Sequence, residues 1–377
     1  MRKKSLLFFI CLFTFASQAS TSQQMNQAFE ALSKLVPFLI SEGQFQEKKN
    51  SQLIEDNLIK IQRAFKAAGH EGLVKQEVFL PSYQLIQENL SESLQSFKSG
   101  NKEIALWRLK ELTAICLDCH TRLPGELPSS YELTGLDVDQ SRFTDAYNLG
   151  IAQLIVRRYL DAKNSFTKSI DQKILKGDTK DLINPFKQIL LIEIKVHKNP
   201  LAMITFIDHY SDKKGLSLEL KKTLQNWKEQ LRIWSKKNIS SEGFKTDKEV
   251  QSFIKSSVEP LTQHAQLEDG HDVDHLLISG LLSNYLFRNK QSNLGPDLNF
   301  WIGRSEKYLK RENFFGSGDL FFKQCILRYP KHAMASKCFD EYKDSIEFEF
   351  SGSSGTHIPP EIKKELNELK GLIIKKK

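Results

Sequence analysis

The chain lacks the features that mark several specialised classes of protein. Only five of its 377 residues are cysteine, which excludes a disulfide-dense miniature protein, and its 40% hydrophobic content excludes a wholly disordered chain. No apolar run after residue 19 is long enough to cross a membrane. No arrangement of Ser, His and Asp or of Cys and His predicts a nucleophilic enzyme. The length then predicts two or three folded domains.

The excess of basic residues does not indicate nucleic-acid binding. The formal net charge is +8, from 54 Lys and Arg against 46 Asp and Glu. Three of these charges lie in Arg2–Lys4 and three more in Lys375–Lys377. The rest of the chain is nearly balanced, so it has no basic surface for the phosphate backbone, and no nucleic-acid partner is predicted.

The first residues have the pattern of a secretory signal peptide. Basic Arg2–Lys4 precede the apolar run Leu6–Ala16, and Ser17–Ala19 supplies the small-x-Ala sequence that signal peptidase cleaves. We expect residues 1–19 to be removed and the mature chain to be periplasmic. The alternative is an uncleaved anchor.

Four segments that follow carry apolar residues at the spacing of amphipathic helices. They span residues 24–40, 52–68, 81–100 and 101–123. Helices of this length with short polar connections favour an up-down four-helix bundle, here over residues 20–128. Residues 129–142, which are rich in polar residues, are predicted to be a linker.

Helical repeats are predicted for the rest of the chain. The spacing of a tetratricopeptide repeat is matched by Leu149, Gly150, Tyr159, Ala162, Phe166 and Ser169. Here Gly150 is expected to let two helices approach closely, with Ala162 facing it. A looser match is made by Gly303, Phe322, Cys325 and Pro330, with about three extra residues between the helices.

These matches predict tetratricopeptide-like repeats over residues 143–240 and further helical repeats over 241–377. A charged helix at 361–374 is expected to cap the array, and only residues 346–350 look extended. The predicted fold class is therefore all-α, a four-helix bundle followed by an α-solenoid.

The most specific motif is Cys116-Leu117-Asp118-Cys119-His120. Two thiols separated by two residues and followed by His form the attachment site of c-type haem. On a helix these positions share one face, so both sulfurs reach the haem vinyl groups while the imidazole of His120 coordinates the iron. A thioredoxin-like pair and half a zinc site are the alternatives, but no strand precedes the motif and there is no second CxxC.

A CxxCH motif at the end of a fourth helix resembles the cytochrome c-prime group and its low-spin relatives, over about residues 22–128. The resemblance implies one covalent haem c, with Cys116 and Cys119 as thioethers and His120 as the proximal ligand. In that group the first helix covers the other face of the haem. Met25, on the first predicted helix, is therefore a candidate distal ligand, with core packing as the alternative, and His70 is a weaker candidate.

The sequence also predicts where two further residues near the motif lie. Thr121-Arg122 stands where the resembling proteins often have Tyr-Arg, so Arg122 is expected either to contact a haem propionate or to lie on the surface. Trp107 is expected in the bundle core near the haem edge.

The last two cysteines, Cys325 and Cys338, are predicted to form a disulfide, because they lie on consecutive helices of an exported protein. The alternative is a pair of buried small residues. His271 and His275 lie one helical turn apart but lack an evident third metal ligand. The segment Ser351–Gly355 resembles a phosphate loop only in composition and is expected to be a connector.

Three functions fit this sequence. The first is a periplasmic electron carrier in which the repeats dock a redox partner protein or complex. The second is a haem-based binder or sensor of NO or CO, which needs an open sixth iron position. The third is an interaction scaffold with a structural haem. No enzymatic activity is predicted.

Overall fold

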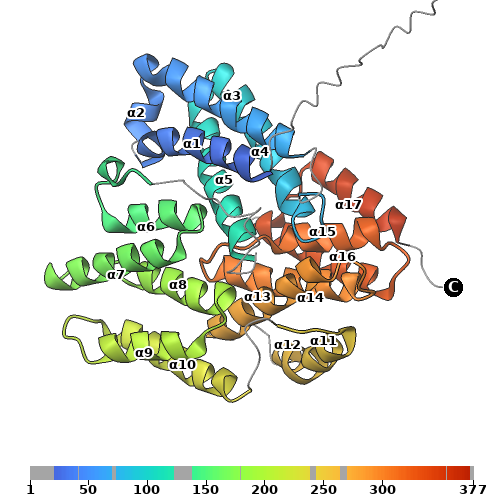
Figure 1. The fold of residues 1–377 in the computed structure, drawn as a ribbon. Coiled ribbons are helices and arrows are strands. Elements are labelled where there is room, and N and C mark those ends of the chain that lie inside the picture. The colour runs from blue at the N-terminus through green and yellow to red at the C-terminus, as the bar shows by residue number, and fades with distance from the viewer. Residues whose placement is uncertain are drawn as a thin grey trace, which may run out of the picture.

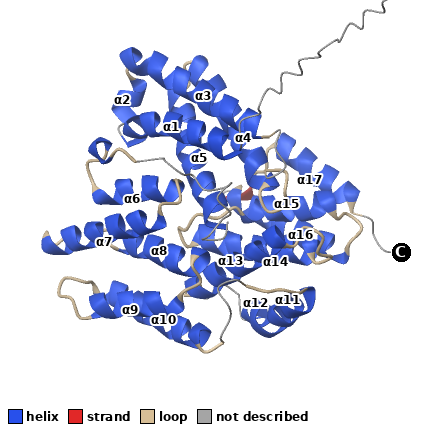
Figure 2. Cartoon of the chain, in the orientation of Figure 1, coloured by secondary structure: helices blue, strands red, loops and turns tan. Residues whose placement is uncertain are grey.

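The computed structural model describes residues 21–40, 42–69, 74–122, 138–178, 180–237, 243–263, 270–353 and 355–373. The predicted signal peptide, His70 and residues 129–137 of the predicted linker lie outside these ranges. The described chain is all-α, as the helical periodicity predicts (Figure 2). None of the described helices is long and apolar enough to cross a membrane.

The first part of the fold consists of four long helices, each of which packs against the next (Figure 1). They are α1 (Thr21–Ile40), α3 (Ser51–Ala68), α4 (Leu80–Lys98) and α5 (Lys102–Arg122), with the short α2 (Glu42–Gln46) and η1 (Lys48–Asn50) between the first two. Leu35, Leu58, Leu90 and Leu109 are all buried between them. These four helices are the ones predicted for residues 20–128; their interpretation as a haem-binding bundle stays a prediction.

The second part is a series of helices that pack mainly against their sequence neighbours. Its first half contains η3 (Gln140–Arg142), α6 (Ala146–Ile155), α7 (Tyr159–Leu175), α8 (Ile183–Leu191), the π-helix η4 (Ile192–Val196), α9 (Pro200–Ser211) and α10 (Leu218–Ser235). Its second half contains α11 (Asp247–Phe253), the π-helix η5 (Ile254–Val258), α12 (Glu259–Gln263), α13 (Asp272–Arg288), α14 (Gly295–Arg311), α15 (Gly318–Arg328), α16 (Ala333–Glu349) and α17 (Pro360–Leu372). Helix pairs α6–α7, α9–α10, α13–α14, α14–α15 and α15–α16 make the main contacts.

One prediction about secondary structure is wrong. Residues 346–349, expected to be extended, form the last turn of α16. Ile346 is buried one turn after the buried Tyr342, so the amphipathic spacing of the helix continues to its end. Strand structure in the described chain is confined to the antiparallel pairing of β1 (Ser351–Gly352) with β2 (Gly355–Thr356).

Two close helix contacts have the same construction. A Cβ atom on Gly150 of α6 would lie 2.6 Å from the Phe166 ring of α7, and one on Gly303 of α14 would lie 2.6 Å from the Phe322 ring of α15. The expected partner of Gly150, Ala162, is fully buried, but the aromatic ring one turn further on lies against the glycine. In both helix pairs a missing side chain leaves room for an aromatic ring, whereas the tetratricopeptide-like repeat itself stays a prediction.

Gly150→Ala is therefore expected to destabilise the protein by about 1–3 kcal/mol, because the Phe166 ring must move in a packed core. Gly371→Ala on α17 is the matched control. No atom lies within 4 Å of its added Cβ, so it should be neutral or slightly stabilising. Urea unfolding of the two variants measures the difference. Equal stability of both variants contradicts the tight contact.

The end of α5 lies where the two parts of the fold meet. The helix contacts α6, η4 and α13, and α4 contacts α15. Glu77, just before α4, accepts hydrogen bonds from Asn299 on α14 and from the Tyr329 hydroxyl at 2.8 Å. One continuous core of buried apolar residues runs through both parts. The helix that carries the CxxCH motif is thus surrounded by elements distant in sequence.

Candidate haem-attachment site

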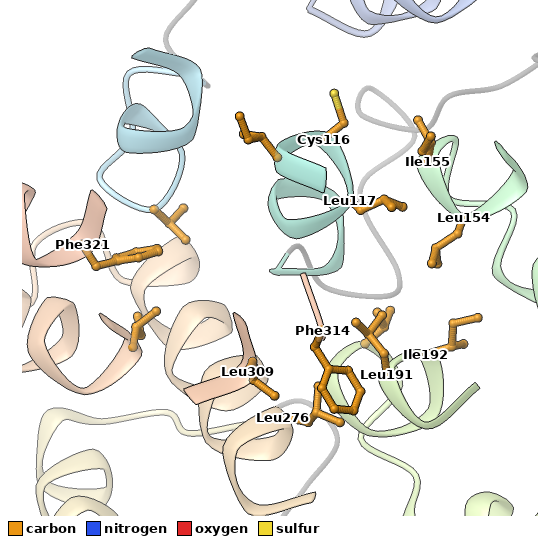
Figure 3. Close-up of a cluster of buried hydrophobic side chains, with 14 of the residues drawn as sticks. Cys116, Leu117, Leu154, Ile155, Leu191, Ile192, Leu276, Leu309, Phe314 and Phe321 are labelled. Carbon is orange, nitrogen blue, oxygen red and sulfur yellow. The ribbon is translucent and has the colours of Figure 1, made fainter. Parts of the chain in front are cut away.

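The CxxCH motif forms the last turns of α5, which ends at Arg122. Cys116 is buried, whereas Cys119 and His120 are half-buried. Their spacing places all three on one face of the helix. Figure 3 shows Cys116 and Leu117 on different sides of the same turn, with Leu117 toward Leu154 and Ile155 of α6. The motif therefore lies on a helix, as the sequence predicts, and haem attachment stays a prediction.

The imidazole of His120 is oriented by the turn that joins α6 to α7. Its Nδ1 atom is hydrogen-bonded to the carbonyl oxygen of Ile155, and the Tyr159 hydroxyl donates to the His120 carbonyl at 3.1 Å. A carbonyl oxygen only accepts, so Nδ1 carries the proton and Nε2 keeps the lone pair that binds a metal. Metal-ligating histidines in proteins are commonly held in this way.

Burial keeps the motif side chains uncharged. It lowers the pKa of His120 to about 4, with a further contribution from the charge of Arg157, so the imidazole is neutral at neutral pH. Burial also raises the pKa of the Cys116 thiol to about 12 and that of Cys119 to about 11. Neither cysteine is in a disulfide. Two free thiols and a neutral imidazole on one face are the donor set of a covalent haem.

In the part of the chain that the structure describes, the motif included, no group of three or more His, Cys, Asp or Glu side chains is arranged around a common point as metal ligands would be. The His271 ring contacts the Asp274 carboxylate at 2.8 Å, and the His275 ring stacks on Tyr308 with 4.0 Å between ring centroids. His271 is thus bonded to a side chain at the start of α13, and His275 packs between α13 and α14.

Four charged side chains, one of which is Asp118 of the motif itself, form a buried cluster at the end of α5. Asp118, Arg122, Lys195 and Glu306 are each at most 1% exposed. Arg122 donates to the Asp118 carboxylate at 2.8 Å, and Lys195 lies 3.3 Å from Asp118 and 2.7 Å from Glu306. Although burial alone raises the pKa of Asp118, the charges of Arg122 and Lys195 hold it below its usual value. We call these four residues the buried charge cluster.

The cluster joins the motif helix to the helical array. Its four members come from α5, η4 and α14. The hydroxyl of Ser317, just before α15, donates to Asp118, and that of Ser279 on α13 donates to Glu306. Because a buried charge is costly without partners, these contacts specify how the array packs on α5.

The structure corrects the expected place of Arg122. It is not on the surface: its guanidinium donates to the carbonyl of Val78 at 3.0 Å and to the hydroxyl of Ser82, and it stacks 4.7 Å above the Phe321 ring. Its donors are used within the protein, so the propionate contact has no support here. The spacing Asp118–Arg122, four residues apart on a helix, was the sequence signal for this pair.

The sequence does not identify Lys195 and Glu306 as members of this cluster. The only local signal for Lys195 is its position in the segment from Leu190 to Val196, which is apolar except for Glu193 and Lys195. Glu306 lies in a helix with many charged residues, so nothing in its neighbourhood distinguishes it.

The expected place of Trp107 is wrong as well. The indole is 53% exposed on α5, with the Arg108 guanidinium 4.8 Å from its ring. Its neighbours Leu106 and Leu109 take the buried positions of that helix turn. The cation–π contact with the neighbouring arginine stabilises the indole on the helix surface, so Trp107 does not require a buried position.

Met25 and the cysteine pair lie in the predicted elements. Met25 is half-buried on α1 and packs against the apolar core, and α1 contacts α5. Its role as a distal ligand stays a prediction. Cys325 and Cys338, on α15 and α16, form the disulfide expected from the sequence, with their Cα atoms 6.3 Å apart.

Comparison of the chain with protein-family models, curated proteins and solved structures found no match.

Proposed function

We propose that this protein is an exported c-type cytochrome that carries single electrons. Cys116 and Cys119 would hold one haem c by thioether bonds, and His120 would be its proximal ligand through Nε2. When bound, the haem supplies a one-electron cycle between Fe(III) and Fe(II). The observation that carries the proposal is the His120 imidazole, neutral and fixed at Nδ1 by the Ile155 carbonyl, beside two free thiols.

Other residues of the chain would orient the haem ligand and dock the partner. The Ile155 carbonyl and the Tyr159 hydroxyl orient the ligand turn, and the buried charge cluster holds the end of α5 in the fold. The tetratricopeptide-like array would dock the redox partner protein or periplasmic complex, since such arrays present extended surfaces to other proteins.

The proposal is tested by producing the full chain with haem-maturation machinery. We expect a c-type absorption spectrum and haem that stays on the polypeptide in a denaturing gel. The double variant Cys116→Ala/Cys119→Ala should lose all covalent haem, because no thioether can form. The matched control, Cys325→Ala/Cys338→Ala, should keep it. A wild-type band without haem refutes the proposal.

Met25 decides between the electron carrier and the gas binder. We expect a low-spin, six-coordinate spectrum that turns high-spin in Met25→Leu, since leucine keeps the volume but offers no sulfur. The control is Met203→Leu on α9, a buried methionine of the array, which should leave the spectrum unchanged. A five-coordinate spectrum in the wild type refutes ligation by Met25 and favours a binder of NO or CO.

A further inference from the structure

Glu306 is the one member of the buried charge cluster whose carboxylate is only half satisfied. One oxygen, Oε1, accepts from Lys195 Nζ at 2.7 Å and from the Ser279 hydroxyl. The other, Oε2, is buried and has no hydrogen-bond donor among the described residues. The side chain also lies within hydrogen-bonding reach of the Asp118 carboxylate. If Glu306 is protonated, its carboxyl O–H can therefore donate a hydrogen bond to the Asp118 carboxylate.

The charged side chains near Glu306 shift its pKa in opposite directions. Asp118 and Arg122 face it from α5 and Lys195 from η4, while Ser279 of α13 is uncharged. Burial, followed by the charge of Asp118, raises the pKa of Glu306 to about 7, against the opposing effect of the two cations. A carboxyl group whose pKa is raised in this way binds a proton more readily than a solvent-exposed glutamate does.

Glu306 is also tied to the motif. It shares Lys195 with Asp118, and Asp118 lies between the two motif thiols in the sequence. Adding an electron at the site makes its surroundings more negative, and an anion nearby in a low-dielectric interior opposes that change. A carboxylate that binds a proton in the same step becomes neutral, so it no longer opposes the added negative charge.

We propose that Glu306 takes up one proton from solvent when the site gains one electron, and releases it on oxidation. This inference depends on the proposed haem function. In the balanced step one electron from a reduced redox protein converts Fe(III) to Fe(II), and one proton adds to a carboxylate oxygen of Glu306. The total charge of the buried region stays the same.

The test is the midpoint potential of the haem-bearing full-length protein as a function of pH, with dithionite as the reductant. Between about pH 6 and pH 8 we expect the wild-type Fe(III)/Fe(II) equilibrium to shift toward Fe(III) by about tenfold per pH unit, because one proton accompanies each electron. For a one-electron couple this is ~59 mV per pH unit. Glu306→Gln should show no shift over this range, because the amide does not titrate.

Glu193→Gln is the matched control. Glu193 is also buried and lies on η4, but it pairs with Lys163 at 2.6 Å and with His197. It should keep the wild-type pH dependence. A variant of Glu306 with the full wild-type shift, or a wild type without any shift, overturns the proposal.

A second measurement uses only the wild-type protein, so it does not depend on the folding of a variant. Reduced-minus-oxidised infrared spectra of the wild-type holoprotein should show a carboxylic-acid band that grows on reduction near pH 7. No such gain on reduction overturns the proposal. A gel without covalent haem refutes the proposed function, whereas a haem-bearing protein with a potential independent of pH refutes proton uptake by Glu306 alone.

Discussion

Asp118→Ala is expected to lower the free energy of unfolding by about 3–5 kcal/mol, the cost of removing one partner from a buried ion pair. The carboxylate accepts from Arg122 at 2.8 Å and lies 3.3 Å from Lys195. Its loss leaves Arg122 without its anion in a site that is at most 1% exposed. Urea unfolding followed by circular dichroism, at equal haem content, measures the change.

The control is Asp161→Ala, which removes a surface ion pair with Arg158. That carboxylate also lies on a helix and contacts an arginine three residues away, but its side chain is 37% exposed. Its loss should cost less than about 1 kcal/mol, since water replaces the arginine. If both variants lose the same stability, the cluster contributes no more than a surface pair, and its role in joining α5 to the array is refuted.

Removing the disulfide is expected to cost about 3 kcal/mol, because Cys325 and Cys338 are 13 residues apart and their bond restricts the unfolded chain. Both residues are fully buried between α15 and α16. The comparison is the urea midpoint of the wild type with and without a thiol reductant. The midpoint should fall in reductant, toward that of Cys325→Ala/Cys338→Ala.

The double variant is also the control for the reductant, which should leave its midpoint unchanged. A wild type whose midpoint does not respond to the reductant contradicts the disulfide. A response of equal size in the double variant would assign the effect to other groups, such as the thiols of Cys116 and Cys119.

The prediction of helices succeeded where apolar spacing was regular. The four helices from 24 to 123 and the capping helix were placed to within a few residues, since an amphipathic face alone determines where such a helix must lie. It is wrong at residues 346–350, which look extended in the sequence. There the buried Ile346, one turn after Tyr342, continued the helix, and packing outweighed local preference.

Some residues of the candidate site can likewise be predicted from the sequence, and others cannot. Cys116, Cys119 and His120 are recognisable as a motif because the proposed chemistry depends on spacing along one helix, and five residues of sequence contain that spacing. The disulfide was also predictable, from the cysteines left unpaired and the predicted compartment. Arg122 and Trp107 were misplaced because exposure on a helix depends on which elements pack over it, and those elements lie elsewhere in the sequence.

By itself, then, the sequence determined the helices with regular apolar spacing, the CxxCH motif and the cysteine pair, all of which depend on short-range spacing. Only the tertiary structure decided that the motif helix lies against the array, with Asp118 held by Lys195 77 residues away and by Ser317 199 residues away. The physical reason is that a buried charge is stable only beside its partners, and their choice depends on packing over the whole chain. The position of Glu306 in that cluster follows from the fold alone.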